Sequence, residues 1–271
     1  MAGKGFDLVL NSDNIRGRFK WMTTFLLNGA TDRVTRYQLQ PSANAVYISG
    51  EYPKVGQSST ALFAYPWAGL DPTNGNPRGF LNQNHQIDTD YVAIMNSLNG
   101  DMHAHGSYLP LISGGILNTF TWKSFALSAL MTFKADYRFR RPSIDYNRMF
   151  TGQYAGVKDY DQRWQKPGDE RHTSVPSFPQ VNDPNRDLFY QNADILVTRG
   201  DHLRWQSLQL DYLLTSRRHP RWRFHQADIY TYINNIGLIW KANHYGIDPD
   251  ASAYGTMPAV RSYSIGIKTT F

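Results

Sequence analysis

The stretch RSYSIGIKTTF, residues 261–271, alternates apolar and polar side chains along most of its length. Its odd-numbered positions from 263 carry Tyr, Ile, Ile, Thr and Phe, whereas its even-numbered positions carry Ser, Gly, Lys and Thr. Because successive side chains of a β-strand point to opposite faces, this pattern predicts a strand with one largely apolar face. Residues 18–27 and 125–134 alternate in the same way. The chain is therefore predicted to be all-β and built from long antiparallel strands.

Shorter runs of alternation predict further strands. They are Phe6–Asn11, Thr60–Trp67, Ile116–Trp122, Leu203–Leu214, Phe224–Ile233 and Gly237–Trp240. Ile87–Leu98 and Ser143–Phe150 suit a short helix instead. Several strands are near the ~9–11 residues that a tilted strand needs to cross a bilayer. Their two faces fit a barrel with lipid outside and a polar lumen inside, although the strands of a soluble sandwich alternate as well.

The lengths of the connections help to separate these two folds. Asp13–Gly17 and Thr121–Ser124 are predicted to be tight turns, whereas about 40 residues after Trp67 and over 50 after Tyr137 are largely irregular. Compact soluble domains rarely contain structureless loops longer than ~12–15 residues. Outer-membrane barrels combine short turns on one side with long external loops on the other. We therefore predict part of a transmembrane β-barrel with long external loops.

Composition excludes several other classes of protein. The 271 residues include 14% aromatic and 18% charged residues, unlike a disordered chain, and no Cys, so disulfides and thiolate metal sites are excluded. The net charge is +6, but Lys and Arg are scattered, and their densest group, Arg217–Arg223, suits a basic turn. No nucleic-acid partner is therefore predicted. No run approaches the ~20 apolar residues of a membrane-spanning helix, and Met1–Phe6 lacks the apolar segment of a signal peptide.

Two possible metal sites have incomplete sets of ligands. If His103 and His105 lay on a strand, they would share one face, but the sequence places no third ligand beside them, and we expect a polar external loop there. Asp71–Gly75 resembles the start of a calcium loop, yet Asn82 stands at the twelfth position, where such a loop has a bidentate Glu. Asp, Pro, Asn and Gly are also turn residues, so we expect a plain turn there. No metal and no other cofactor is predicted.

The acidic residues Asp159, Asp161, Asp169 and Glu170 lie in a segment rich in Tyr and Trp. Paired carboxylates hydrolyse glycosides at a defined separation, but nothing in the sequence fixes one here. The glycine motifs of hydrolases and nucleotide-binding enzymes are absent, so no catalytic residue is assigned and no enzyme is predicted. Aromatic side chains in these loops could stack on sugars or peptides, or simply pack within the loops. The candidate ligand-binding residues are Trp67, Asp71, Tyr154, Tyr160, Trp164 and Asp169.

An ordered series of motifs resembles the C-terminal portion of the SusC/RagA-like TonB-dependent transporters. In chain order the motifs are GFDL (5–8) with FKW (19–21), YPWAGLDPTNGNP (65–77), Gly115–Leu127, WQKPGDE (164–170) with Pro176, DHLR (201–204) with Leu208, Leu210 and Tyr212, Asn234-Asn235, YGIDP (245–249) and the strand from 261 to 271. His202 departs from the family pattern, which usually has an aromatic residue there. Each motif alone is weak, but together they cover most of the chain in the family's order.

The resemblance implies a barrel of about 22 strands with an N-terminal plug in its lumen. Residues 1–271 would supply roughly 9–11 of these strands and no plug. Members of the family import oligosaccharides or peptides across the outer membrane of Bacteroidetes-type bacteria, with energy from TonB acting through the plug region. A SusD-like surface lipoprotein caps the barrel. Phe271 resembles the terminal aromatic residue that the barrel-assembly machinery reads as a signal.

The expected location is therefore the outer membrane, in contact with its lipid, as part of an exported chain or complemented by one. Part of a nutrient importer, not competent by itself, is the leading interpretation. Two alternatives remain open from the residues alone: a soluble β-rich carbohydrate-binding module and a secreted glycosidase that uses the loop carboxylates.

Overall fold

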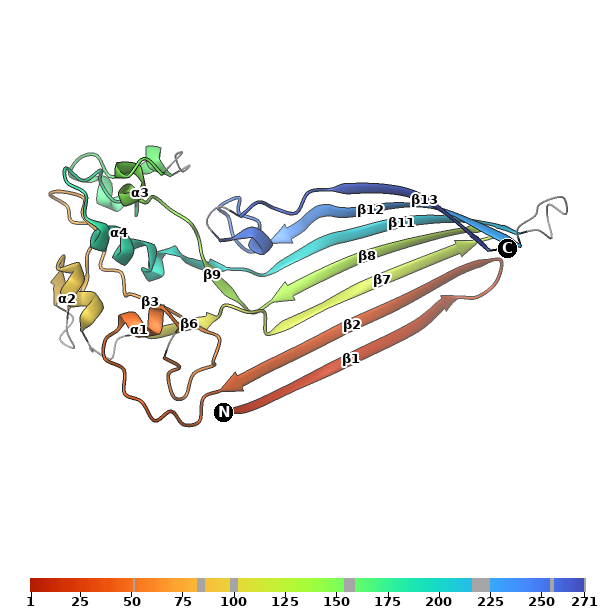
Figure 1. Ribbon diagram of the computed structural model, residues 1–271, viewed down its shortest axis with the longest axis horizontal. Coiled ribbons are helices and arrows are strands. Elements are labelled where there is room, and N and C mark those ends of the chain that lie inside the picture. Colours follow the sequence, from red (N-terminus) through yellow and green to blue (C-terminus); the bar gives the residue numbers. More distant parts are fainter. Residues whose placement is uncertain are drawn as a thin grey trace.

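The computed structural model describes residues 1–50, 52–81, 86–97, 102–153, 159–215, 225–253 and 256–270. The chain forms one long antiparallel sheet with a folded loop region at one end (Figure 1). The order of the seven strands is β1-β2-β7-β8-β11-β12-β13, and the sheet is not closed. Its strands are β1 (Ala2–Ile15), β2 (Phe19–Arg33), β7 (Ile112–Trp122), β8 (Phe125–Ala135), β11 (His202–Thr215), β12 (Gln226–Lys241) and β13 (Ser262–Thr270). β1 and β13 are its two edges.

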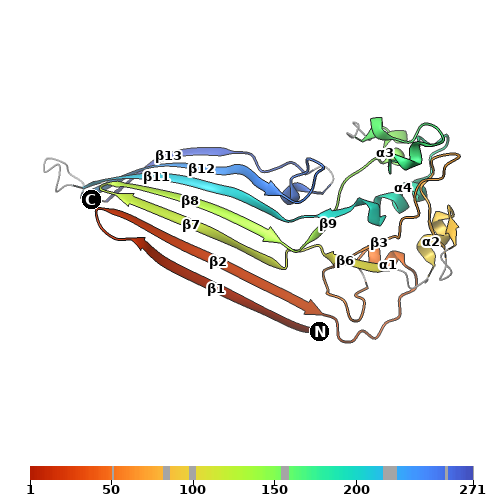
Figure 2. The ribbon, with the colours of Figure 1, turned by 180° about the vertical axis from the view of Figure 1, so that it is seen from behind.

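Short turns and long connections lie at opposite ends of the sheet (Figures 1 and 2). Arg16–Arg18 join β1 to β2, and Lys123 and Ser124 join β7 to β8. Lys123 has φ +56°, the left-handed conformation that two-residue hairpin turns require. The connections β2–β7, β8–β11 and β12–β13 return at the other end, which we call the loop end. This arrangement agrees with the predicted asymmetry of connection lengths.

The two faces of the sheet differ in polarity. The apolar face contains Phe125, Leu127, Met131 and Phe133 of β8, with paired residues of the neighbouring strands such as Phe120. Its aromatic rings stack across strands, with Phe125 and Tyr212 centroids 4.6 Å apart. The polar face contains Ser128, Thr132 and Lys134 of the same strand.

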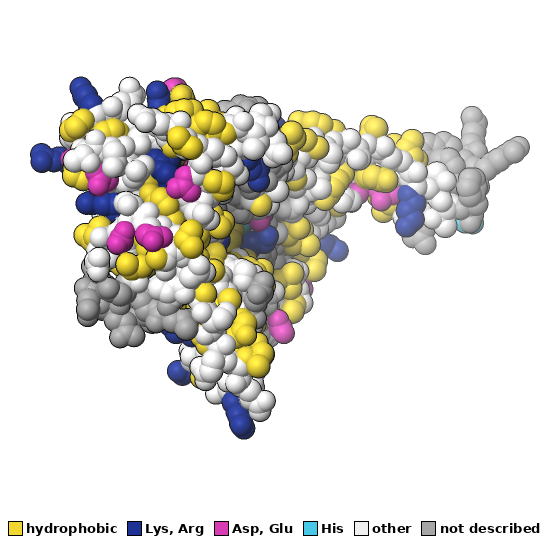
Figure 3. Space-filling model, turned by 60° about the vertical axis from the view of Figure 1, so that its left-hand side comes forward, with side chains coloured by type: hydrophobic (Ala, Val, Ile, Leu, Met, Phe, Trp, Pro, Cys, Tyr) yellow, Lys and Arg dark blue, Asp and Glu magenta, His cyan; other side chains and the backbone are white. Residues whose placement is uncertain are grey.

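No second sheet among the described residues covers the apolar face. Phe125 remains 44% exposed and Leu210 45% exposed, and hydrophobic side chains lie open along the sheet (Figure 3). A soluble sandwich would bury these side chains between two sheets. The prediction of one sheet with an uncovered apolar face is therefore confirmed.

The predicted count of roughly 9–11 long strands is wrong for the described residues, because the sheet has seven. The alternation at Thr60–Trp67 forms only a short strand, β3 (Ala61–Ala64), which pairs with β6 (His103–Ser107) outside the sheet. The described part of Phe224–Ile233 from Gln226 onward and Gly237–Trp240 belong to a single strand, β12, whereas Phe224 lies outside the described residues. Asn235 at φ +53° and Gly237 at φ +147° shift the register there and interrupt the alternation. A bulge of this kind divides one strand into two apparent patterns.

The loop region contains short elements that surround two hydrophobic clusters. They are α1 (Ala45–Ile48), β3 (Ala61–Ala64), β4 (Gly79–Phe80), β5 (Ile87–Asp88), α2 (Tyr91–Asn96), β6 (His103–Ser107), β9 (Arg138–Arg140), α3 (Tyr146–Phe150), η1 (Tyr160–Gln162), η2 (Asp169–Arg171), α4 (Pro184–Gln191), η3 (Asp194–Leu196), β10 (Val197–Arg199) and η5 (Pro249–Ala251). α2 and α3 confirm the two predicted short helices. None of the described helices is long and apolar enough to span a membrane.

The buried core of the molecule lies in these loops and not against the sheet. The first cluster consists of Phe63, Tyr65, Tyr91, Ile94, Met95, Met102 and Phe189, and the second of Ile144, Tyr146, Val175, Tyr190 and Leu196. α4 contributes Phe189 to one cluster and Tyr190 to the other, and both side chains are fully buried. α4 therefore links the two clusters at the loop end.

Candidate functional site

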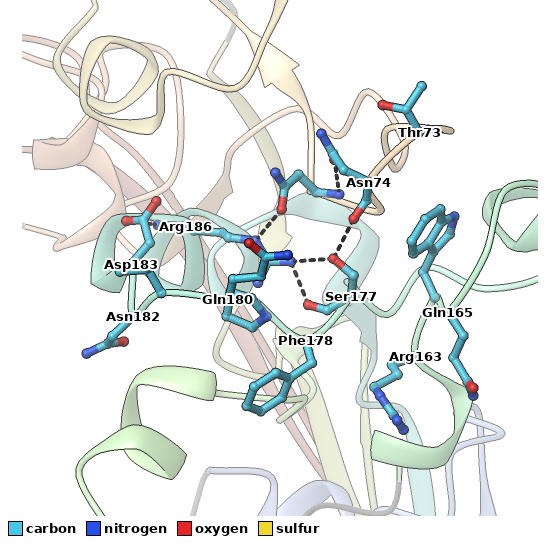
Figure 4. Close-up of a pocket in the computed structure, with 14 residues that line it drawn as sticks. Thr73, Asn74, Arg163, Gln165, Ser177, Phe178, Gln180, Asn182, Asp183 and Arg186 are labelled. Atoms are coloured by element: carbon cyan, nitrogen blue, oxygen red, sulfur yellow. Dashed lines mark hydrogen bonds between the residues drawn. The ribbon is translucent and has the colours of Figure 1, made fainter.

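A cavity of about 1090 Å³ opens within the loop region (Figure 4). Its walls come from the turn after Asp71, from the segment around Trp164, and from the residues between Ser177 and Arg186. These stretches lie in two different connections, β2–β7 and β8–β11. The packing of one long loop against another therefore creates the cavity.

Asp71 shapes the first wall as a turn residue. Its Oδ1 accepts hydrogen bonds from Thr73 N at 2.8 Å and from Thr73 Oγ1, which hold the pKa of Asp71 below its usual range. Gly75 N donates to the Asp71 carbonyl at 2.8 Å. The plain turn expected for this segment is confirmed. Gly75 has φ +70°, and a Cβ there would lie 2.4 Å from the Trp164 ring, so glycine allows the two loops to meet.

Arg186 on α4 holds the walls together from within. Its Nε donates to Asn76 Oδ1 at 2.9 Å, and its Nη2 donates to the Ser177 carbonyl at 2.7 Å. The residue is only 2% exposed, and Asp183 caps the helix by accepting from Arg186 N at 3.1 Å. Figure 4 shows these hydrogen bonds at the centre of the cavity, with Gln180 beside the guanidinium. A buried guanidinium with several acceptors fixes the wall geometry.

The lining is rich in amide side chains. Asn74, Asn76, Gln165, Gln180 and Asn182 all line the cavity. Each primary amide can donate and accept, which suits ligands with neighbouring donors and acceptors, such as peptide bonds or sugar hydroxyls. Phe178 and Val181, 46% and 76% exposed, add apolar surface. Among the described lining residues Asp183 is the only carboxylate, and it caps α4.

The structure brings only part of the predicted ligand-binding set to this cavity. Trp164 lines it, and Asp71 and Asp169 shape the adjoining turns. Trp67 and Tyr160 pack against the second cluster instead, with the Trp67 and Tyr190 ring centroids 5.7 Å apart. Tyr154, proposed for the same role, and Phe271, proposed as the assembly signal, lie outside the described residues. Ligand binding by the other five residues stays a prediction.

The loop carboxylates have structural hydrogen bonds. Asp169 Oδ2 accepts from Gln165 N at 3.0 Å and Lys166 N at 3.1 Å, and these bonds lower its pKa. Glu170 Oε2 accepts from Gly168 N at 2.8 Å and Trp164 Nε1 at 3.3 Å. Asp159 pairs with Arg141 at 3.3 Å and with the Ser143 hydroxyl. Three of the four carboxylates thus hold the loops in shape, and Asp161 is exposed.

His103 and His105 both lie on β6, a short strand within the loop region. His103 is exposed, and burial lowers the pKa of the half-buried His105. Among the described residues no group of three His, Asp or Glu side chains gathers where a metal ion could bind.

Comparison with solved structures relates this geometry to a known assembly. Three structures match 99% of the chain: the RagAB peptide importer in its "open-open" state (TM-score 0.69, 18% identity), the same importer in its "closed-closed" state (0.69, 19%) and the RagAB peptide transporter (0.71, 18%). The chain resembles part of a peptide importer. It spans only 28–29% of the length of the chains it matches. No family model and no curated protein sequence matches it.

At this level of identity, the likeness to the importer concerns the fold. It extends to the mostly β architecture with an open antiparallel sheet, and covers the loop region as well as the strands. The backbone that carries the cavity therefore resembles that of the matched structures, whereas the side chains that line it are specific to this chain.

Sequence reasoning missed several residues that build the cavity. Ser177, Gln180 and Arg186 follow no functional motif, and no periodic pattern marks them. Asp183-Pro184 is nevertheless a helix-start signal, with an N-cap residue followed by Pro at the first helical position. This signal could have located α4, but not the direction in which Arg186 points.

Asp187 is expected to make the stability of the loop region depend on pH. Burial raises its pKa to about 6, while Asn147 N donates to its Oδ2 at 2.6 Å. A raised carboxyl pKa means that the folded state binds the proton more tightly. The protonated Asp187 carboxyl therefore contributes its full stabilisation of the folded state below about pH 4. This stabilisation, at most about 3 kcal/mol, is lost as pH rises through about 6.

Hydrogen-exchange protection of the α4 amides in the assembled barrel between pH 4 and 7 measures this effect. Asp187→Asn should flatten the pH dependence, because an amide stays neutral throughout. Asp161→Asn, at an exposed carboxylate, is the matched control and should leave the dependence unchanged. Protection that rises with pH in the unaltered chain would contradict the assignment.

Proposed function

We propose that this chain forms part of the wall and external loops of a TonB-dependent outer-membrane nutrient importer that takes up peptides or oligosaccharides. In this proposal the apolar face of the sheet contacts lipid and the polar face lines the lumen. The loop end lies outside the cell. A SusD-like lipoprotein would cap the loops, TonB would act through a plug that these residues do not supply, and the barrel-assembly machinery would insert the barrel.

The distribution of aromatic side chains on the apolar face is the observation that carries the proposal. Near the turns this face has Phe19, Trp21, Phe120, Trp122, Phe125 and Tyr212. Towards the loop end it has Phe6, Phe133, Trp205, Trp240 and Tyr263. Between these two bands lie aliphatic residues such as Ile116, together with Phe25 and the polar pair Thr23 and Asn118. Outer-membrane barrels have an apolar band flanked by two aromatic girdles, because aromatic rings favour the membrane–water interface.

The side-chain oxygen of one polar residue on the apolar face is hydrogen-bonded. The Asn118 side-chain oxygen accepts from Trp21 Nε1 at 2.9 Å and from Thr23 Oγ1 at 2.7 Å. An unpaired amide would be costly against lipid. These two hydrogen bonds lower the cost of placing Asn118 on a surface that contacts lipid.

The amide-lined cavity in the loops supports uptake of polar ligands as the role of the external end. Binding residues concentrate on loops above a rigid scaffold. The cavity opens in such loops, and its amides and aromatic rings suit either peptides or sugars. Of these two classes of ligand, the structural likeness to a peptide importer favours peptides.

Cysteine labelling of the assembled barrel in cells tests the proposal, and the natural chain has no Cys to interfere. Leu127→Cys and Met131→Cys should resist a water-soluble maleimide. Ser128→Cys and Thr132→Cys, on the opposite face of the same strand, should react with it. Equal reaction on both faces would be incompatible with a sheet that separates lipid from an aqueous lumen.

A further inference from the structure

A second, smaller cavity of about 210 Å³ is lined by three arginines. Arg140 ends β9, Arg141 follows it, and Arg148 lies on α3. The remaining wall includes Asp145, Asn192 at the end of α4, and Ser252 from the β12–β13 connection. The two long connections β8–β11 and β12–β13 therefore meet around a basic hollow.

The charges that line this cavity do not balance. Arg148 Nε lies 3.2 Å from Asp145 Oδ2, and Arg141 Nη1 lies 3.3 Å from Asp159 Oδ2. Arg140 donates only to neutral oxygens, those of Asn192 at 2.7 Å and of the Phe63 carbonyl at 2.8 Å. It forms no ion pair with any described residue. One guanidinium charge at the cavity is thus left uncompensated.

Two donors at the cavity also have no partner among the described residues. They are the Nε atoms of Arg140 and Arg141, both buried from solvent. Arg141 is only 8% exposed, and its guanidinium lies 4.5 Å from the centre of the Tyr245 ring. Buried donors normally have an acceptor, so unused donors on residues that line a cavity indicate that an acceptor arrives from outside.

A purely structural role accounts for part of this arrangement. Through Asn192 and Phe63, Arg140 ties α4 to β3, and Arg141 ties its segment to Asp159. These contacts use the terminal nitrogens and leave both Nε atoms unused. Burial lowers the pKa of Arg140, as expected for a cation that lacks a counter-charge.

We propose that Arg140, Arg141 and Arg148 form a subsite for a carboxylate group of the imported ligand, such as the terminal carboxylate of a short peptide. Guanidinium groups bind carboxylates through paired, charge-assisted hydrogen bonds. A cavity of about 210 Å³ accommodates one terminal residue and not a longer chain. The inference rests on the proposed importer function and names the chemistry of one end of its cargo.

Calorimetric titration of the assembled barrel that contains the full chain tests the subsite. The probes are Ala-Ala-Ala, its C-terminal amide, acetate and inorganic phosphate. The free acid should bind at least tenfold more tightly than the amide, and added salt should reduce the difference. Acetate should compete with the tripeptide, because the subsite is expected to bind the carboxylate group itself.

Variants connect the preference to the arginines. Arg148→Gln should remove most of the difference between acid and amide, and Arg148→Lys should keep part of it. Arg36→Gln, at an exposed arginine of the β2–β7 connection, is the matched control and should keep all of it. If Arg148→Gln does not fold, the comparison of acid with amide on the unaltered chain still decides.

Equal affinity for acid and amide would overturn the inference, as would binding of phosphate without binding of either carboxylate probe. Either result leaves the cysteine-labelling pattern of the sheet untouched. Conversely, uniform labelling of both faces would defeat the importer proposal whatever the loops bind. The two failures can therefore be told apart.

Discussion

Residues 1–271 produced alone behind an export signal should give no heat-modifiable, membrane-inserted monomer and no ligand uptake. The cause is the pair of open edges at β1 and β13. Each unpaired backbone group in hydrocarbon costs several kcal/mol. If half of the nine residues of β13 left their backbone groups unpaired, the cost would already exceed the ~5–15 kcal/mol net stability of a typical domain. Aggregation or degradation is the expected outcome, because alternating apolar edges pair with other chains.

Co-production with strands that pair with both edges should restore insertion and uptake. Electrophoretic mobility with and without heating follows insertion, and growth on peptides as sole nitrogen source follows uptake. Stable insertion and uptake by the chain alone would show that its edges are paired in some other way, and the open sheet would then not be its functional state.

Ile116→Arg should prevent stable insertion of the assembled barrel, whereas Leu117→Arg should be tolerated. Both residues are aliphatic and lie in the middle of β7. Ile116 pairs with Phe25 and Met131 on the apolar face, and Leu117 lies on the polar face opposite Thr24. An arginine facing lipid near the midplane costs about 2–4 kcal/mol, while an arginine in an aqueous lumen costs little.

The fraction of inserted, heat-modifiable protein measures this difference. Leu117→Arg controls for β-propensity and for added charge, because only the face differs between the two variants. A reversed ranking would assign the lumen to the apolar face, and equal losses would point to a strand buried on both faces.

The sheet could be predicted because its information is local. Strict alternation in residues 125–134 and 261–271 depends only on the period of a strand, and the structure has β8 and β13 there. The bulge at Asn235–Gly237 hid a single long strand, because a register shift reverses which positions face which side. The short strand at Ala61–Ala64 misled in the opposite way, since alternation does not reveal which partner a strand will pair with.

The loop region was less predictable because its contacts join distant residues. The local sequence does not predict that Gly75 packs against the ring of Trp164. It also does not predict that Arg186 donates to both Asn76 and Ser177. Trp164, one of the predicted ligand-binding residues, lies in the cavity wall, but aromatic content could not separate it from Trp67 and Tyr160, which pack inside the loops. The turn residue Asp71 and the helix cap Asp183 can be recognised from the local sequence. They locate a turn and a helix start, but they do not predict the cavity.

The number of strands in the sheet restricts what can complete it. β1 and β13 both run from the loop end towards the turns, because seven antiparallel strands leave the two outermost ones pointing the same way (Figure 1). Joining these strands directly would create a parallel seam, and two copies of the chain arranged around a common axis would create two such seams. A cylinder that is antiparallel throughout has an even number of strands. The missing arc must therefore supply an odd number of strands, and it must begin and end with strands that run from the turns towards the loop end, which copies with the same orientation as this chain do not offer.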